Sequence, residues 1–342
     1  NNLAGDFKLM NDIDLAGVDW TPVGTFTGTF DGQGHVIKNM KITKNSSVVG
    51  FFTKTQNATI QNLGFENANV VGTDQDVAVI VGQLQGSVLK NCYVANSFVQ
   101  GRDHVGALAG MIRNVEGLSE DDPNLVGGNI SDCMSDAQVK STSYQAGGLV
   151  GVSRGGIVER CIFSGTVDCP GNATGIVSLV DKAANDANGN QTIATTFIRN
   201  NFVGASHLYG NVTRIVAPGG RGVILENNYV LASTYTGTNA ASAGTMDNQL
   251  DPNTATGANV DDATAKTTAF YTSLGFDFTN NWKFFDTTEG KMFPVLKWVN
   301  APLPSSIFDM PQNKSILFKA GVESISLNPI HGSWGQTLSF DI

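Results

Sequence analysis

The sequence has few charged residues and no cluster of basic ones. Charged side chains make up 15% of the 342 residues, and the formal net charge is −9. Without a run rich in Lys and Arg, neither nucleic acid nor an anionic membrane surface is an expected partner. No apolar run approaches the roughly 20 residues that span a bilayer, so we expect no membrane insertion by this part of the chain.

Motifs for metal and cofactor chemistry are also missing. The four histidines include no His-Glu-x-x-His arrangement, which excludes the common zinc-peptidase site from this chain. The four cysteines include no Cys-x-x-Cys pair of the kind that holds a structural zinc. P-loop, dinucleotide-binding and nucleophile-elbow motifs are absent as well. We therefore expect no metal site, no cofactor and no catalytic residues.

Glycine and hydrophobic residues are abundant instead. The chain has 39 glycines and 41% hydrophobic residues, and Asn, Thr and Ser are common. This composition is rich in turn formers and favours β-structure. It also contains enough apolar side chains to bury a large core.

A six-position pattern recurs eight times along the chain. Its first position is always apolar and its second always polar, which is the alternation of a half-buried strand. The first-position residues are Met10, Ile37, Ile60, Leu89, Ile130, Val158, Ile198 and Leu225. We expect these eight side chains to be buried and to form one continuous stack.

The third position of the pattern predicts a bend. Five of its eight residues are Asn and two are Asp, the residue types that best tolerate a left-handed backbone. After the bend the fourth and sixth positions should again point inward. Cys92, Cys133 and Cys161 then fall in consecutive coils of one inward column. Their parallel Cβ vectors disfavour bridging, so we expect these thiols, and Cys169, to be reduced.

A second signature, Val-Gly followed by apolar residues, adds a further strand upstream of each later unit. It occurs at Val49, Val81 and Val105, and in altered form at Ala146 and Thr174. Most repeats span 23–29 residues, which suits three short strands and three turns. Such units must stack to bury their inner faces, and parallel crossovers are almost always right-handed. The predicted fold is therefore all-β: a single-stranded right-handed parallel β-helix, or pectate-lyase-like solenoid.

Two long repeats carry insertions, at residues 111–128 and 181–195. Both follow the Val-Gly strand, so we expect them to leave the coil at the same corner, two coils apart. Their acidic side chains make this corner the candidate ligand-binding site, where calcium or a cationic or hydroxyl-rich ligand could bind. These acids are Glu116, Glu120, Asp121, Asp122, Asp181 and Asp186. Paired carboxylates of this kind could also serve glycan hydrolysis.

The fifth position should face solvent, yet most of its side chains are large and uncharged. Its residues are Lys41, Gly64, Tyr93, Met134, Ile162, Phe202 and Tyr229. A stripe of this kind indicates a cover or a partner. We expect another part of this chain to cover it, and the alternatives are a ligand-binding face or a stripe that is simply tolerated at the surface.

The repeats stop after Leu231, and the C-terminal region differs in character. Asp261 and Asp262 could begin a helix over Ala263–Leu274, which Gly275 would end. The aromatic residues that follow suggest a cap over the open end of the β-helix. We predict one domain over residues 1–300, with its cap from about residue 260. Residues 301–342 form a linker and a short β segment that this prediction does not assign to the domain.

The segment Gly24–Met40, with its Gly-rich turn, resembles the opening coil of bacterial surface proteins with GLUG-type repeats. The closing segment Phe270–Trp298 is also similar to theirs. The resemblance covers about residues 3–300. Such repeats occur in adhesin-like proteins and in the non-catalytic regions of proteins named as immunoglobulin A-specific metallopeptidases. It implies an extracellular or cell-surface location and a host or cell-surface protein or glycan as partner.

The sequence thus favours a non-enzymatic extracellular module: an adhesin-like or ligand-binding scaffold of a surface protein. One alternative is a carbohydrate-active hydrolase or lyase on a β-helix. Another is an accessory region of a secreted immunoglobulin A-type metallopeptidase, without its zinc site. A test for cleavage of a panel of glycans distinguishes the non-enzymatic module from the carbohydrate-active enzyme.

Overall fold

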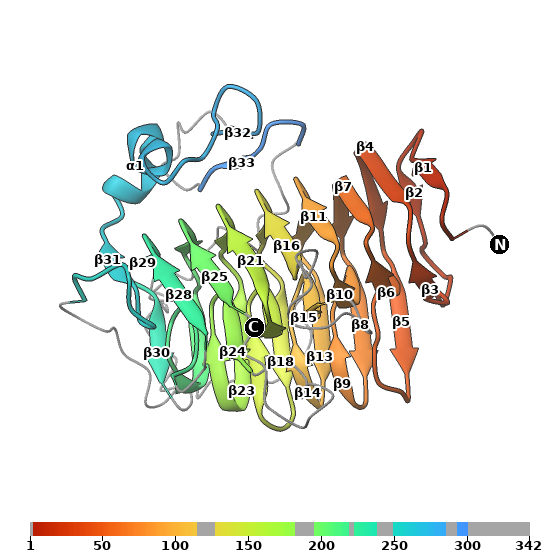
Figure 1. Cartoon of the computed structure of the whole chain (residues 1–342), viewed down its shortest axis with the longest axis horizontal. Coiled ribbons are helices and arrows are strands. Elements are labelled where there is room, and N and C mark those ends of the chain that lie inside the picture. The colour runs from red at the N-terminus through yellow and green to blue at the C-terminus, as the bar shows by residue number, and fades with distance from the viewer. Residues whose placement is uncertain are drawn as a thin grey trace, which may run out of the picture. The chain divides into compact units, whose positions relative to one another are not determined.

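The computed structural model describes residues 3–114, 127–181, 195–218, 222–237, 249–284 and 293–299 (Figure 1). These residues form an all-β structure of mostly parallel strands in stacked sheets, with very little helix. The chain visits three sheets in turn, here named A, B and C, and each repeat pairs with the one before it. This arrangement is consistent with the expected β-helix.

Sheet A contains the six-position pattern in most repeats. Its strands are β1 (Asp6–Lys8), β2 (Ile13–Asp14), β4 (Thr29–Lys38), β7 (Thr59–Glu66), β11 (Val88–Lys90), β12 (Tyr93–Ala95), β16 (Gly128–Ser131), β17 (Met134–Ser135), β21 (Gly156–Glu159), β22 (Ile162–Phe163), β25 (Thr196–Arg199), β26 (Phe202–Val203), β28 (Val223–Glu226), β29 (Tyr229–Leu231) and β31 (Ala258–Val260).

Sheets B and C complete each repeat. Sheet B consists of β5 (Lys41–Lys44), β8 (Asn69–Gly72), β9 (Gln75–Val77), β13 (Phe98–Gly101), β14 (Asp103–Val105), β18 (Gln138–Ser141), β19 (Gln145–Gly147), β23 (Thr166–Thr174), β27 (His207–Val212) and β30 (Tyr235–Gly237). Sheet C consists of β3 (Val23–Phe26), β6 (Phe52–Gln56), β10 (Val81–Gln85), β15 (Ala109–Arg113), β20 (Val150–Arg154) and β24 (Val177–Val180).

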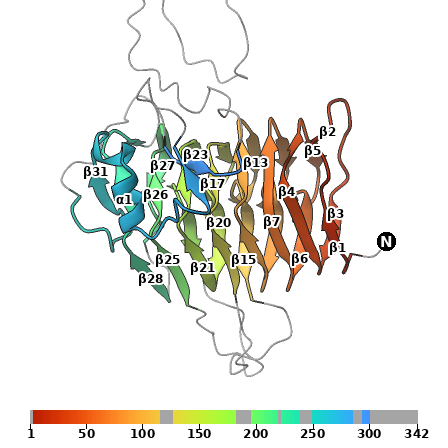
Figure 2. The same cartoon turned by 90° about the horizontal axis from the view of Figure 1, so that it is seen from above.

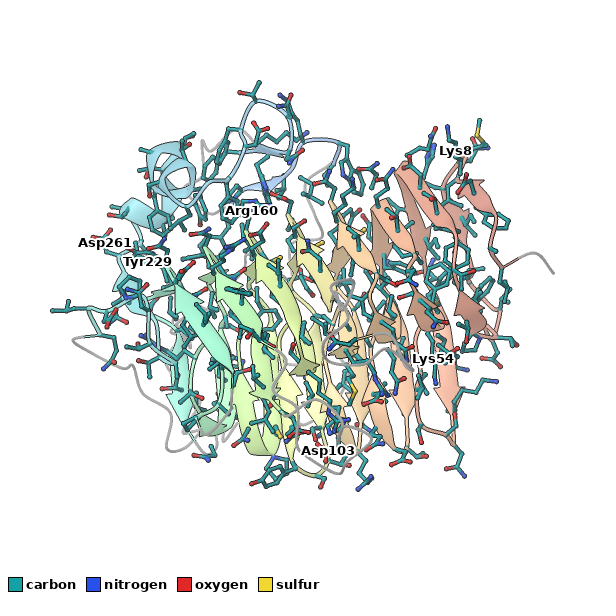
Figure 3. The ribbon with its side chains drawn as sticks, in the orientation of Figure 1. Lys8, Lys54, Asp103, Arg160, Tyr229 and Asp261 are labelled. Carbon is teal, nitrogen blue, oxygen red and sulfur yellow. The ribbon has the colours of Figure 1, made fainter. Side chains whose placement is uncertain are left out.

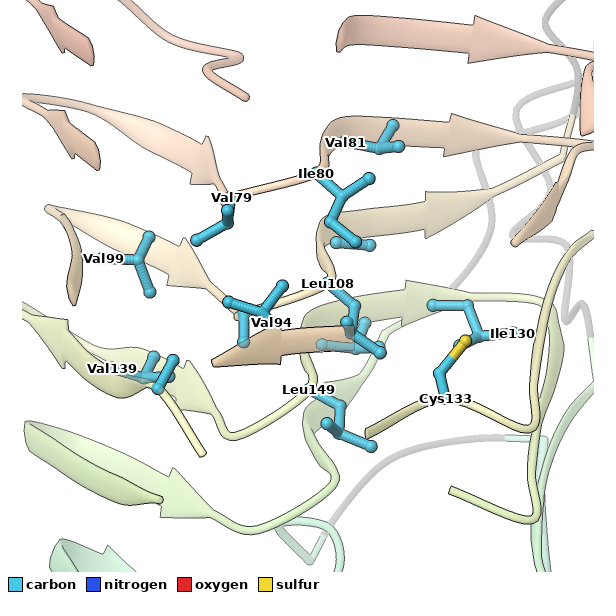
Figure 4. Packing of buried hydrophobic residues seen from close by; sticks show 14 of the residues in the cluster. Val79, Ile80, Val81, Val94, Val99, Leu108, Ile130, Cys133, Val139 and Leu149 are labelled. Atoms are coloured by element: carbon cyan, nitrogen blue, oxygen red, sulfur yellow. The ribbon is translucent and has the colours of Figure 1, made fainter. Parts of the chain in front are cut away.

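Six of the eight first-position residues stack in register as predicted. The pairs run without a gap through Ile60, Leu89, Ile130, Val158, Ile198 and Leu225. The first five of these side chains have no exposed surface, and Leu225 is partly buried. Figure 4 shows Ile130 among the other buried residues of this core.

The prediction was wrong for Met10 and Ile37. Met10 is 72% exposed, and Ile37 pairs with Phe65, while Phe30 pairs with Ile60. In the first repeats a second bend also uses a left-handed Asn, at Asn67 and Asn96, and Phe65-Glu66-Asn67 shows the same apolar-polar-Asn pattern. Ile37-Lys38-Asn39 belongs to this second bend, and the sequence pattern does not distinguish the two.

The predicted left-handed bend is present from Asn62 onward. Asn62, Asn91, Asp132, Arg160, Asn200 and Asn227 have φ between 50° and 57°. Some of their amides hydrogen-bond between repeats, as from Asn227 Nδ2 to Asn200 Oδ1 at 3.2 Å. In β4, Gln33 (φ 54°) and Gly34 (φ 81°) form the bend instead, where the register shifts between Asp31 and His35.

Cys92, Cys133 and Cys161 form the inward column that the register predicted. Each side chain is completely buried, and the Cys92 backbone N–H lies 3.4 Å from Cys133 Sγ. Burial raises the pKa of the Cys133 and Cys161 thiols well above the usual range. None of the four cysteines is bridged in the structure, and their redox state in solution stays a prediction.

Asn201 and Asn228 continue the cysteine column toward the C-terminal repeats. Both are fully buried in the core. Asn201 Nδ2 donates to Val158 O and Asn228 Oδ1, and Asn228 Nδ2 donates to Ile198 O. These bonds satisfy amides that would otherwise be costly to bury.

The Val-Gly signature marks the approach to sheet C, with one error in its alignment. Val49 and Val105 both align with Val77, not with Val81. Val81 instead pairs with Phe52 and Ala109 inside sheet C. The two valines are equally apolar and four residues apart, so only the register separates them.

The last repeats are held by a buried arginine. Arg214 is completely buried, and its guanidinium donates to Thr256 O, Gly257 O and Asn259 Oδ1. Burial lowers its pKa to about 10. These bonds attach the segment that leads into β31, which pairs with β29.

The C-terminal region contains a shorter helix than predicted. A 3₁₀ turn, η1 (Thr264–Lys266), precedes α1 (Thr268–Ser273). Asp261 Oδ1 accepts from the Thr264 N–H, and the Thr267 hydroxyl accepts from the Phe270 N–H, so each turn has its own N-terminal cap. The antiparallel pair β32 (Trp282–Lys283) and β33 (Val295–Leu296) follows.

We call residues 261–299 the cover segment, because its described residues pack on the fifth-position stripe. Tyr93, Met134, Ile162 and Phe202 form one buried cluster with its apolar side chains. Figure 2 shows α1 and this segment lying across the strands of sheet A. The stripe is therefore covered by the chain itself, as expected. The expected cap over the open end is corrected, because the described residues cover the side of sheet A.

The buried column gives a direct test of the register. We expect Ile130→Asp to destabilise the fold by about 3–5 kcal/mol, because an unpaired charge enters the apolar core. Ile224→Asp is the matched control, since Ile224 faces outward from the same sheet and is 40% exposed. It should cost about 1 kcal/mol or less. Equal losses in denaturant unfolding would contradict the inward assignment of Ile130.

Candidate ligand-binding surface

The two insertions leave the structure where the sequence placed them. They follow β15 and β24, which lie in sheet C with β20 between them. Glu116, Glu120, Asp121, Asp122 and Asp186 lie outside the described residues. At the acidic corner, the structure therefore describes only the residues at the ends of the strands that flank the two insertions.

Asp181 is the one predicted site residue that the structure describes. Arg154 binds its carboxylate through both Nε and Nη2, at 3.1 and 2.8 Å from Oδ2. In register, Arg154 lies beside Arg113 on the neighbouring strand. The corner is thus less acidic than the sequence indicated, because the prediction had left Arg154 out.

The fifth-position stripe is a covered surface and not an open ligand face. Trp298 packs on Tyr93 with ring centroids 5.2 Å apart, and Phe202 packs on Tyr271 at 5.5 Å. Gly64 leaves the space that the Tyr93 ring fills. Lys41 does not belong to this stripe, since it pairs in sheet B and Val36 takes its place.

Beside this stripe, an ion-pair network of sheet A binds the cover segment. Arg160 binds Asp132 through Nε and Nη2, at 3.2 and 3.0 Å, and also contacts Glu159. The Trp282 indole N–H donates to Asp132 Oδ1 at 3.2 Å, although 150 residues separate the two. Figure 3 shows Arg160 on the side of sheet A that faces the cover segment. The one Arg in the bend column therefore has a structural partner.

A buried polar chain lies where sheet B approaches sheet C. Asp76 is completely buried, and its two oxygens lie 2.7 Å from His104 Nδ1 and 2.5 Å from Gln83 Nε2. Gln85 Nε2 donates in turn to Gln83 Oε1. A carboxylate that orients an imidazole is part of hydrolytic triads, but no hydroxyl or thiol among the described residues hydrogen-bonds this pair. The chain of bonds satisfies a buried charge at a left-handed bend.

Among the described residues, the outer face of sheet B presents partly or fully exposed side chains. Inward residues in its successive strands are fully buried, namely Ile42, Val70, Val99, Val139, Val167 and Leu208. The residues on either side of each of them are partly or fully exposed. By contrast, the outward residues Met111 and Val152 of sheet C are buried.

The C-terminal part of this open face combines rings with polar groups. His207 and Tyr209 point outward from β27 on either side of Leu208, and their rings stack at 5.0 Å with an interplanar angle of 11°. Asp168 pairs in register with Tyr209, and Lys140 forms an ion pair with Asp168 at 3.5 Å.

The sequence analysis missed this face because the six-position pattern lies in sheet A. A signal was present in some repeats: a single Val or Leu lies between two larger residues with polar groups at Val139 and at Leu208. Short alternations of this kind are weak evidence until the register aligns them.

The described residues show neither a metal centre nor a transmembrane helix. No group of three or more His, Cys, Asp or Glu side chains in the described ranges is arranged to hold a metal ion. Within the same ranges, no helix combines the length and the hydropathy that crossing a bilayer requires.

Comparison with known proteins identifies similar chains but no family. No protein-family model matches the chain, so the GLUG-type repeat stays a prediction. Halomucin from Haloquadratum walsbyi is 30% identical over 145 residues, which is 37% of this chain but 2% of halomucin. A crystal structure from Bacteroides ovatus, named as a "putative immunoglobulin A1 protease", is similar with a TM-score of 0.63 and 25% identity. The match covers 86% of each chain.

A buried carboxyl that follows β17 leads to a pH-dependent prediction. Asp136 Oδ1 accepts from the Asn96 N–H at 2.7 Å, while Oδ2 is buried without a partner. Burial, with a contribution from Glu66, raises the pKa of Asp136 well above its usual range. Because the folded pKa is raised, wild-type stability falls as pH rises above the unfolded value of about 3.9.

Asp136→Asn, which cannot ionise, should therefore raise the melting temperature at pH 7 and have a smaller effect near pH 3.5. Asp19→Asn is the control, because its exposed ion pair with Lys41 contributes little. An Asp136→Asn variant that is no more stable than wild type at pH 7 would contradict this account.

Proposed function

We propose that this chain is a non-enzymatic ligand-binding module of an extracellular surface protein. Its scaffold would be a right-handed parallel β-helix over residues 1–300 that includes the cover segment. Residues 301–342 would be a linker and a short β segment. The stacked parallel sheets and the similarity to the Bacteroides structure support this scaffold.

The comparisons also support an extracellular or cell-surface location. The two similar proteins are named "Halomucin" and "putative immunoglobulin A1 protease", and both names fit a location outside the cell. Because the match covers only 2% of halomucin, the similarity concerns one small part of that protein. A repeat module of this kind presents surfaces, and its activity depends on which surface stays open.

The open outer face of sheet B is the observation that carries this proposal. The cover segment buries the apolar stripe of sheet A, whereas sheet B presents outward polar and aromatic side chains across successive strands. A binding face needs such accessible groups on a rigid support. The partner would be a glycan or a protein at a host or cell surface.

Two alternatives remain as separate hypotheses. A glycan hydrolase or lyase would need two carboxylates placed across a sugar, and the acids of the two insertions are the candidates for that role. An accessory region of a secreted immunoglobulin A-type metallopeptidase would carry its zinc motif in another part of the protein. The full-length gene, searched for that motif, tests the second alternative.

Incubation with a panel of polysaccharides and surface glycoproteins tests the main proposal. We expect the purified chain to retain at least one of them without producing new reducing ends or unsaturated sugars. Binding is measured by retention on immobilised ligand, and turnover by a reducing-end assay and absorbance. Cleavage of any glycan would replace the proposal with the enzyme hypothesis, and absence of all binding would remove it.

The acidic corner is a second candidate site, since both insertions leave sheet C with one strand between them. Carboxylates that lie close together recruit cations, so we expect calcium to bind there if the two insertions meet. Calorimetry should detect calcium with the wild-type chain and not with a variant that lacks residues 115–126 and 182–194. The same heat from both proteins would eliminate the corner, and the sheet B proposal would stand.

A further inference from the structure

The outer face of sheet B contains one compact grid of side chains whose chemistry indicates a ligand class. Three neighbouring strands contribute two outward residues each, in register. The grid consists of Gln138 and Lys140 from β18, Thr166 and Asp168 from β23, and His207 and Tyr209 from β27. We infer that this grid binds an uncharged, hydroxyl-rich glycan, a step that rests on the proposed binding function.

The rings supply a surface on which a sugar can pack. His207 and Tyr209 alternate with the buried Leu208, so both project from the same face of β27 and support each other by stacking. Aromatic rings bury apolar area while their polar atoms remain available for hydrogen bonds. The C–H face of a pyranose can lie against such rings while its hydroxyls reach the neighbouring strands.

The neighbouring strands supply donors and acceptors for hydroxyl groups. The Gln138 amide, the Thr166 hydroxyl and the Asp168 carboxylate together offer both kinds of group. Adjacent strands are about 4.8 Å apart, a spacing of the size of one sugar ring. A linear glycan that crosses the strands would therefore meet one row of the grid with each successive sugar.

The charges of the grid favour a neutral ligand over an anionic one. Lys140 is paired with Asp168, so its charge is balanced within the grid. Burial lowers the pKa of His207, which keeps the imidazole neutral at pH 7. Burial and Asp168 raise the pKa of Tyr209, which keeps its hydroxyl protonated. Sulfated or sialylated glycans would find no unpaired cation among these six side chains, on a chain of net charge −9.

The strand topology argues against a peptide partner. β18, β23 and β27 are paired on both sides within sheet B, so they offer no free backbone edge for an added strand.

Another row of outward side chains lies on β21 and β25 of sheet A. Its charges are paired, because Arg199 binds Glu159 and lies over the Phe197 ring. Nothing in the structure indicates what would cover that row.

The test compares two matched double variants of the full chain on a glycan array with neutral, sulfated and sialylated members. His207→Ala/Tyr209→Ala removes the rings, and Asn69→Ala/Val71→Ala changes the same two outward positions of β8. We expect wild type and the β8 variant to bind neutral glycans alike and the ring variant to bind about tenfold more weakly. Tyr209→Phe, which retains the ring, should keep most of the affinity, and Tyr209→Ala alone, which should lose affinity, replaces the double variant if that variant does not fold.

The outcomes separate this inference from the proposed function. Unchanged neutral-glycan binding in the ring variant would overturn the grid while leaving a binding module. A preference for anionic glycans, or binding of protein ligands alone, would have the same consequence. Absence of every ligand from the wild-type chain would overturn both.

Discussion

Backbone hydrogen bonds between equivalent strands of successive repeats determine where the described side chains of sheets A, B and C lie. Each short strand is paired with its counterpart one repeat away, so one inward residue places the next. A single repeat cannot bury its own inner face. The apolar column from Ile60 to Ile198 and the buried cysteines beside it are consequences of this pairing.

The same pairing that buries the core also aligns outward-facing side chains into columns. Where such a column is apolar, another part of the protein must cover it. In sheet A, the stripe that contains Tyr93 and Phe202 is apolar, and the cover segment buries it. Trp282 and Trp298 reach Asp132 and Tyr93, so residues that follow the last repeat stabilise much earlier ones. The packing of the cover segment therefore requires several stacked repeats.

Function then depends on which outward surfaces remain exposed once the cover segment has buried the stripe of sheet A. In sheet B, the outward residues of β18, β23 and β27 are partly or fully exposed, and each of these strands is paired on both sides, which makes this part of the sheet a rigid surface without a free edge. Binding groups on such a support lose little conformational entropy when a ligand arrives. The buried pair of Asp76 and His104 resembles part of a catalytic triad. Its hydrogen bond instead satisfies buried polar groups at a left-handed bend.

The sequence by itself determined the parallel stacking, the inward cysteine column, the left-handed Asn bend and the need to cover the fifth-position stripe. Each follows from local chemistry, namely alternation, backbone preference and exposed apolar area. Only the tertiary structure decided which bend Asn39 occupies, because Asn62 and Asn67 mark two different left-handed bends of the next repeat after the same apolar-polar pattern. It also decided that Arg154 neutralises Asp181, and that His207, Tyr209 and Asp168 lie side by side. Those contacts join residues about 27 to 41 positions apart, and no local pattern specifies which repeat stacks on which until every register is set.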